Sequence, residues 1–250
     1  MRLLVRRIFY YEKEKAMKKV VWLTILVVIL SSLLFSCGTD EEANLFLVRQ
    51  TYTDKSGTTT VSYLYNEEYK IIKQLTDTGK DSSTVSEYEY DENGYQNYQK
   101  IVANSGLIQE LFTKNDSEGR AIENKLITNY NGNITEATTT IEYIDENGSY
   151  IQTSSQGVVI TFTFDDYGNY LSIVSSGAAE QTITYENKYE GGFLMNARIT
   201  TVTKNKTVVQ TAKYAYDKQG NKVKSEIFDE NGNVTVTETF EYSNTPEIIK

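Results

Sequence analysis

Most of the chain alternates residue by residue between hydrophobic and polar side chains, in runs of six to ten residues. In one such run Ile160, Phe162 and Phe164 occupy alternate positions, with threonines between them. Side chains on a β-strand point in turn to the two faces of its sheet, so this pattern predicts strands with one buried face. Runs of this kind between residues 45 and 242 predict about 16 strands, and no helical period appears among them.

Short glycine-containing turns separate these runs and recur at a period of about 25 residues. An aspartate at the first turn position can accept hydrogen bonds from the next backbone amides, and glycine adopts the positive φ that closes the turn. The turn residues that we predict are Asp91, Gly94, Gly119, Asp145, Gly148, Asp165, Gly168, Asp217, Gly220, Asp229 and Gly232. The segments around Glu67-Glu68 and Glu190-Gly191-Gly192 are degenerate copies.

Repeated antiparallel hairpins of this kind predict an all-β fold. Open sheets of more than about ten strands tend to curl or to split, so the array must bury one face against itself. We therefore expect a long, strongly twisted and curved sheet, or an incomplete barrel or roll, of about 16 strands.

The first 36 residues differ from the rest and predict a signal peptide. Lys18-Lys19 precedes the apolar run from Val20 to Phe35, which as a helix would span about 24 Å, less than the hydrocarbon core of a bilayer. A basic start, a short apolar core and small residues at its end are typical of a secretory signal. Met17 is an alternative start. We divide the chain into the signal peptide (1–36), a tether (37–44) and a hairpin repeat domain (45–250).

The only cysteine follows this apolar run directly. Leu34-Phe35-Ser36-Cys37 resembles the lipobox of bacterial lipoproteins, which implies that Cys37 is lipidated and anchors the protein to the outer membrane. The acidic segment Gly38-Thr39-Asp40-Glu41-Glu42 resembles the surface-export tether of Bacteroidetes lipoproteins. This resemblance implies display on the cell surface; retention on the periplasmic face is the alternative.

A second resemblance lies in the turns. The pattern Y-x-Y-D-x-x-G, at Tyr88–Gly94 and Tyr214–Gly220, resembles the YD repeat of Rhs-type proteins over roughly residues 60–242. Similar hairpin arrays occur in Bacteroidetes lipoproteins. In the long Rhs proteins such hairpins wind into a shell around a toxin. With about eight units and no C-terminal toxin segment, we do not expect a closed shell here.

Composition removes most catalytic classes. Histidine is absent, and a single cysteine allows neither an internal disulfide nor a thiolate metal cluster. We therefore predict no catalytic, cofactor-binding or metal-binding residue, and no cofactor. After the leader, 18 basic and 32 acidic residues remain, a net charge of −14 that repels nucleic-acid phosphates.

Tyrosine, with 20 residues, is the remaining functional signal. Tyr63, Tyr65, Tyr88 and Tyr90 could form an aromatic face that binds a glycan or an envelope protein. Alternatively, they are strand formers that fill the core. Our leading hypothesis is a non-enzymatic binding or scaffolding module at the cell envelope. A carboxylate-based glycan-degrading enzyme and a structural fragment of an Rhs-like shell are the alternatives.

Overall fold

A computed structural model of the protein describes residues 45–79, 83–144, 149–177 and 180–249, which fold into one antiparallel sheet. The predicted leader, Cys37, the acidic tether and the turn from Asp145 to Gly148 lie outside the described residues. The strands are β1 (Phe46–Asp54), β2 (Gly57–Tyr65), β3 (Ile71–Asp77), β4 (Ser83–Tyr90), β5 (Gln96–Ala103), β6 (Leu107–Asn115), β7 (Ala121–Tyr130), β8 (Asn133–Tyr143), β9 (Tyr150–Ser154), β10 (Val159–Phe164), β11 (Tyr170–Ser176), β12 (Gln181–Glu190), β13 (Phe193–Thr203), β14 (Lys206–Tyr216), β15 (Lys222–Phe228) and β16 (Val234–Ser243).

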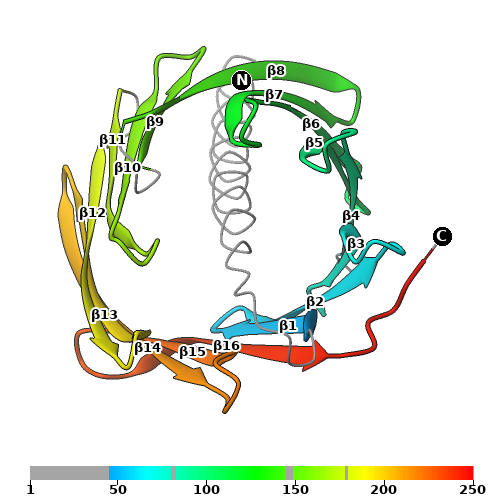
Figure 1. Ribbon diagram of the computed structural model, residues 1–250. Helices are drawn as coiled ribbons and strands as arrows, with labels where there is room; N and C mark the ends of the chain where they lie inside the picture. Colours follow the sequence, from blue (N-terminus) through cyan, green and yellow to red (C-terminus); the bar gives the residue numbers. More distant parts are fainter. Residues whose placement is uncertain (1–44, 80–82, 145–148, 178–179, 250) are drawn as a thin grey trace, which may run out of the picture. The chain divides into compact units, whose positions relative to one another are not determined.

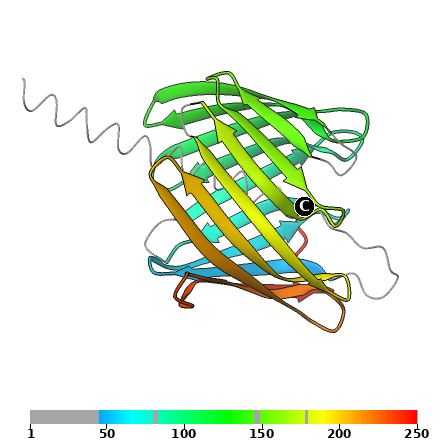
Figure 2. The ribbon, with the colours of Figure 1, turned by 90° about the vertical axis from the view of Figure 1, so that its left-hand side faces the viewer.

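The sheet closes on itself. Each strand pairs with its neighbours in sequence, and β1 pairs with β16 from Phe46↔Ser243 to Asp54↔Val236. Figure 1 shows the resulting barrel viewed along its axis, and Figure 2 shows that its strands run obliquely across the wall. The all-β class and the number of strands are confirmed, but the expectation of an open or incomplete barrel is wrong. Closure pairs the two edges that an open sheet would leave exposed, and the sequence of single hairpins does not report it.

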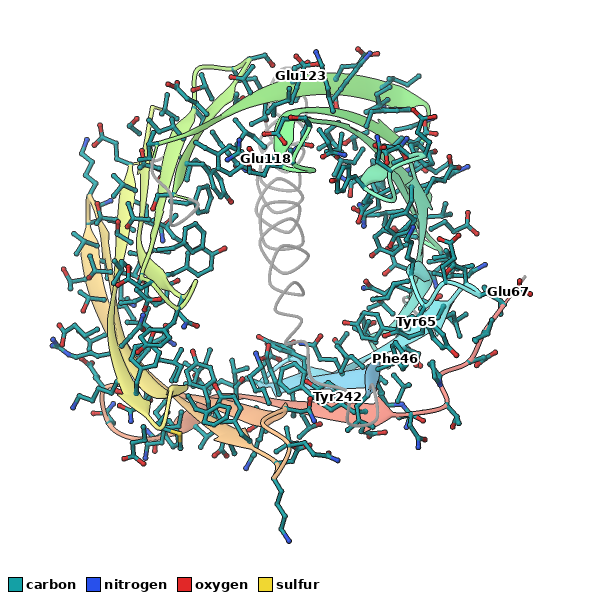
Figure 3. All side chains as sticks on the ribbon, viewed as in Figure 1. Phe46, Tyr65, Glu67, Glu118, Glu123 and Tyr242 are labelled. Carbon is teal, nitrogen blue, oxygen red and sulfur yellow. The ribbon has the colours of Figure 1, made fainter. Side chains whose placement is uncertain are left out.

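The pairing register assigns each side chain to a face, because directly opposite residues in an antiparallel sheet lie on the same face. Along β12, Thr184, Glu186 and Lys188 are exposed, whereas the intervening Tyr185 and Asn187 are partly buried. Inner-face residues include Tyr65 and Tyr242, which point into the ring in Figure 3. The predicted alternation is therefore present, with the more aromatic face inside.

A C-terminal segment reinforces the joint between the first and last strands. β2 pairs with β1 only as far as Ser62, so the end of β2 is left without that neighbour. There the backbone of Tyr65 donates to the carbonyl of Glu247 at 3.0 Å and accepts from the amide of Ile249 at 2.8 Å. Pro246 is buried in the same segment. The chain beyond β16 thus completes the wall beside β1.

The turns use their aspartates as the sequence suggests. Asp217 Oδ1 accepts the backbone amides of Gln219 and Asn221, both at 2.9 Å, and Gly220 has a φ of 85°. The same paired hydrogen bonds occur at the turns that begin at Asp91, Asp116, Asp165 and Asp229.

One degenerate turn shows what this motif requires. It begins at Asn66, whose neutral Oδ1 accepts the amides of Glu68 and Lys70 at 3.0 and 2.9 Å. Tyr69 takes the place of glycine with a φ of 60°. The acceptor oxygen, rather than the negative charge, is therefore the feature common to these turns.

We expect closure to be detectable by crosslinking. Thr51 and Thr239 are direct partners across the β1–β16 joint and lie on the outer face. In a Cys37→Ser background, Thr51→Cys combined with Thr239→Cys should form a disulfide, because the Cα separation of paired strands lies within disulfide range. Peptide mapping without reduction would detect it. The control, Thr51→Cys with Thr184→Cys on β12, places the thiols five strands apart, about 24 Å around the wall, and should not crosslink. Equal crosslinking of both pairs would contradict a closed barrel.

The turn aspartates should make stability depend on pH. Hydrogen bonds from the Asn221 side chain and from backbone amides lower the pKa of Asp217, and those from Asn233 do the same for the pKa of Asp229. A carboxyl whose folded pKa is lowered stabilises the fold above its unfolded pKa, and this contribution disappears as the pH falls through the folded value. The unfolding free energy should therefore decrease below about pH 4.

The matched variant is Asp217→Asn with Asp229→Asn, which keeps the acceptor oxygen that Asn66 supplies in its own turn. Urea denaturation between pH 2.5 and 7 should give a shallower acid loss of stability for this variant than for the native chain. Identical pH profiles would show that these two carboxylates do not contribute.

Candidate functional site

The inner face of the barrel is the candidate site. Sixteen strands enclose a barrel wide enough to leave a water-filled interior, rather than a core filled by side chains. In agreement, inward residues such as Tyr150, Tyr185 and Tyr214 are only partly buried. The interior is thus an aromatic surface that water or a ligand can reach.

The predicted aromatic face lies on this inner surface, on β2 and β4. Tyr65 donates its hydroxyl to the carbonyl of Leu47 at 2.7 Å, and Tyr90 donates to that of Ile71 at 2.7 Å. Each bond joins a strand to the preceding strand, β2 to β1 and β4 to β3. Tyr216 and Tyr242 make corresponding bonds, to Leu194 and Lys222, at 3.0 Å.

The other two predicted tyrosines bond to glutamines of the neighbouring strand. Tyr63 donates to Gln50 Oε1 at 3.0 Å, and Tyr88 donates to Gln74 Oε1 at 2.8 Å. Only 4% of Tyr63 is exposed, and burial raises its pKa. The four predicted tyrosines thus lie together on the inner wall with their hydroxyls engaged by the wall itself.

A belt of packed rings covers the wall from β8 to β12. Ring centroids are 5.6 Å apart for Tyr143 and Tyr150, 4.8 Å for Tyr150 and Phe162, and 5.8 Å for Tyr170 and Tyr185. Aromatic rings at these separations and tilts attract one another beyond simple burial. The belt is therefore a continuous apolar surface with phenolic hydroxyls along it.

Three inner-wall hydroxyls, two in the belt and one on β14, differ from those of the predicted face. In the part of the chain that the structure describes, the hydroxyls of Tyr150, Tyr185 and Tyr214 have no hydrogen-bond partner. Burial raises the pKa of Tyr185 to about 12, and it raises those of Tyr150 and Tyr214 as well, so all three are neutral donors at physiological pH. Polar groups in such surroundings normally bind something, so these hydroxyls are free to bind water or a ligand.

A cation lies on β15, between Tyr214 of β14 and Phe240 of β16. Lys222 Nζ lies 4.6 Å from the ring centroid of Phe240 and 5.9 Å from that of Tyr214, which is cation–π geometry. Burial lowers the pKa of Lys222, and the nearby Glu238 partly opposes this. Glu238 instead accepts a hydrogen bond from the Ser225 hydroxyl at 2.6 Å.

Carboxylates are scarce on the inner wall. By register, the inward acidic residues of the described strands are Asp54 and Glu238. Asp54 lies at the end of β1, where it accepts hydrogen bonds from Ser56 and from the Tyr52 hydroxyl. No set of three potential metal ligands occurs among the described residues. The chemistry available inside is therefore aromatic contact, phenolic donors and cations, of which Lys222 contacts two inner rings.

Within the ranges that the structure describes, no helix is long and apolar enough to cross a membrane.

The outer face carries most of the charged residues of the strands. Lys73, Glu87, Lys100 and Glu110 are consecutive cross-strand partners on β3 to β6, so charge alternates along this row. Exposed ion pairs occur elsewhere around the ring, between Arg49 and Glu241, Lys125 and Glu136, and Arg198 and Glu186, at 3.3, 3.0 and 2.9 Å. Threonines share the remaining outward positions with exposed apolar residues, which include Leu75, Val102, Phe112, Val174 and Val202.

The fold, but not the sequence, is similar to known proteins. A crystal structure of a porin-like protein from Bacteroides vulgatus ATCC 8482 matches with a TM-score of 0.55 at 13% identity, over 80% of this chain and 99% of that chain. A porin-like protein from Bacteroides uniformis ATCC 8492 matches with a TM-score of 0.38 at 13% identity, over 79% and 96%. The likeness shows the fold alone. No protein-family model matches the sequence, and a search of curated proteins finds no match. The resemblance to YD repeats stays a prediction that rests on the turn motif.

Sequence reasoning did not single out Tyr150, Tyr185 or Lys222. The signal for Lys222 was a basic residue at an inward position, but a bulge between Ala215 and Tyr216 shifts the register there. Alternation counted from the turn therefore does not give its face. The unpartnered hydroxyls depend on neighbours from other hairpins, which no single repeat reveals.

We expect the hydrogen bonds from tyrosine hydroxyls to carbonyls of neighbouring strands to contribute to stability. Tyr90→Phe removes the donor to the Ile71 carbonyl and should lower the unfolding free energy by about 1 kcal/mol. Tyr130→Phe, at an exposed residue, should change it by less than about 0.5 kcal/mol. Urea denaturation followed by circular dichroism would measure both. A loss no larger in Tyr90→Phe than in Tyr130→Phe would contradict this role.

Proposed function

We propose that this protein is a lipid-anchored binding module of the bacterial cell envelope, whose barrel stands in water and takes a ligand against its inner wall. The observation that carries the proposal is the polarity of the two faces. Ion pairs lie on the outside, together with threonines and exposed apolar residues such as Leu75 and Val102. Tyrosine rings lie on the inside, where Tyr150, Tyr185 and Tyr214 have free hydroxyls among the described residues.

The outer face argues against a wall that lies in lipid. Barrels that span a membrane carry an outward apolar band about 25 Å tall, and an outward Lys or Arg at its centre costs roughly 2–4 kcal/mol. Here charged pairs lie on strands at several places around the ring, including Lys73–Glu87 and Arg198–Glu186. Such a surface is favourable in water, where paired charges remain hydrated.

The proposed localisation depends on the leader. A lipidated Cys37 would hold the barrel at the outer membrane, and the acidic residues behind it favour the cell surface over the periplasmic face. The resemblance of residues 34–37 to a lipobox supports this part of the proposal.

A membrane channel is the second candidate. It is favoured by the similarity to a protein described as porin-like, with which this chain shares its fold. The two candidates differ in where the wall lies, and so they predict opposite behaviour without detergent. A glycan-degrading enzyme has less support, because the inner wall of the described strands offers only Asp54 and Glu238 as carboxylates. Nothing on the described surface supports a role as a shell fragment.

Membrane attachment tests the proposal. The full chain should fractionate with membranes, whereas Cys37→Ser should lose acylation and the hold on the membrane that acylation gives. Because an uncleaved leader could itself retain the variant, the chain from Gly38 to Lys250 should be purified in parallel. We expect it to be folded and monodisperse without detergent and not to float with lipid vesicles.

Membrane insertion of the barrel would contradict the proposal. A barrel that stays folded only in detergent, inserts into vesicles and conducts ions across a planar bilayer would be a membrane channel. Palmitate labelling of the native chain but not of Cys37→Ser would test the anchor separately from the barrel.

A further inference from the structure

The ammonium group of Lys222 is the feature of the inner wall that its surroundings do not satisfy. In the described part of the chain, no carboxylate oxygen lies within 4.0 Å of Nζ and no hydrogen bond reaches it; its contacts are the faces of Phe240 and Tyr214. A partly desolvated cation without a counter-ion attracts an anionic group strongly, because little water competes for it.

The nearest inward carboxylate does not fill this role. Glu238 lies close enough to influence the pKa of Lys222, but its Oε2 is held by the Ser225 hydroxyl at 2.6 Å on the paired strand. The ammonium therefore remains available to a ligand, and the Glu238 charge weakens rather than replaces that interaction.

The neighbouring tyrosines define the rest of the ligand. Tyr214 lies against Lys222, and Tyr185 lies two strands from Tyr214 on β12; both offer ring faces together with hydroxyls that no described residue engages. A fatty carboxylate would cover the rings but leave these donors unpaired. A sugar ring has an apolar face for stacking and hydroxyls at its rim for hydrogen bonds, so it satisfies both.

The overall charge limits how acidic the ligand can be. The chain after the leader carries −14, which repels a polyanion at long range. A short chain with few carboxylates avoids most of that repulsion and can still contact Lys222.

We propose that the inner wall binds a short acidic oligosaccharide, whose rings stack on Tyr214 and Tyr185 and whose uronate carboxylate pairs with Lys222. This inference rests on the proposed function and specifies its ligand class. The two remain separable, because the barrel can stand in water and bind a different ligand.

The test is calorimetric titration of the mature chain with trigalacturonate at low salt, compared with the fully methyl-esterified trisaccharide, which lacks the charges. Trigalacturonate should bind at least about tenfold more tightly than the ester. Lys222→Met should remove this difference, and Lys222→Arg should retain most of it. Glu238→Gln should tighten trigalacturonate binding by removing a like charge.

The matched control is Lys224→Met. Lys224 lies on the same strand two residues away, but it faces outward and pairs with Glu226 at 2.9 Å, so its loss should leave binding unchanged. Circular dichroism of each variant would show that the barrel is intact. Tyr185→Phe should weaken both trisaccharides, since it removes a hydroxyl and no charge.

Three results would overturn the inference: no binding of trigalacturonate at millimolar concentration, equal affinity for acid and ester, or unchanged affinity in Lys222→Met. Each leaves a water-exposed barrel in place if the detergent-free chain is monodisperse. A chain that needs detergent would instead overturn the proposed function.

Discussion

The pairing of β1 with β16 is the contact on which the rest of this structure depends. It joins residues nearly two hundred positions apart and converts an open array of hairpins into a wall without edges. Closure also gives the sheet an inside and an outside, and so it separates the tyrosines of the inner wall from the ion pairs of the outer wall. The Tyr65 bonds to the C-terminal segment complete the wall at the place where β1 no longer reaches β2.

Repetition explains how such a wall assembles from simple parts. Each turn has its own acceptor oxygen for two amides, so a hairpin can form from local interactions. The tyrosine that precedes the turn then donates its hydroxyl to a carbonyl of the preceding strand, as Tyr90 does to that of Ile71. Local turns and bonds between neighbouring strands repeat along the chain. After sixteen strands, the first edge of the sheet pairs with the last.

The same residue type has two roles on the inner face. Tyr63, Tyr65, Tyr88 and Tyr90 bond within the wall, which accounts for their repeated spacing as a structural requirement. Tyr150 and Tyr185, in the belt, have the same rings without those bonds among the described residues. A binding surface can therefore arise where the wall does not use its own donors. Lys222 adds the charge that gives that surface a preference.

The sequence by itself determined the all-β class, the number of strands and the turn chemistry, because period-two alternation and Asp-x-x-Gly turns act within one hairpin. The alternation of Tyr88 and Tyr90 with glutamates along their own strand also places the two tyrosines on one face, but only closure makes that face the inner one. Only the tertiary structure decided closure, which depends on the twist and stagger summed over all the strands. It likewise decided which tyrosines are free and that Lys222 faces inward, because a bulge at Tyr216 shifts the register and the partners come from other hairpins.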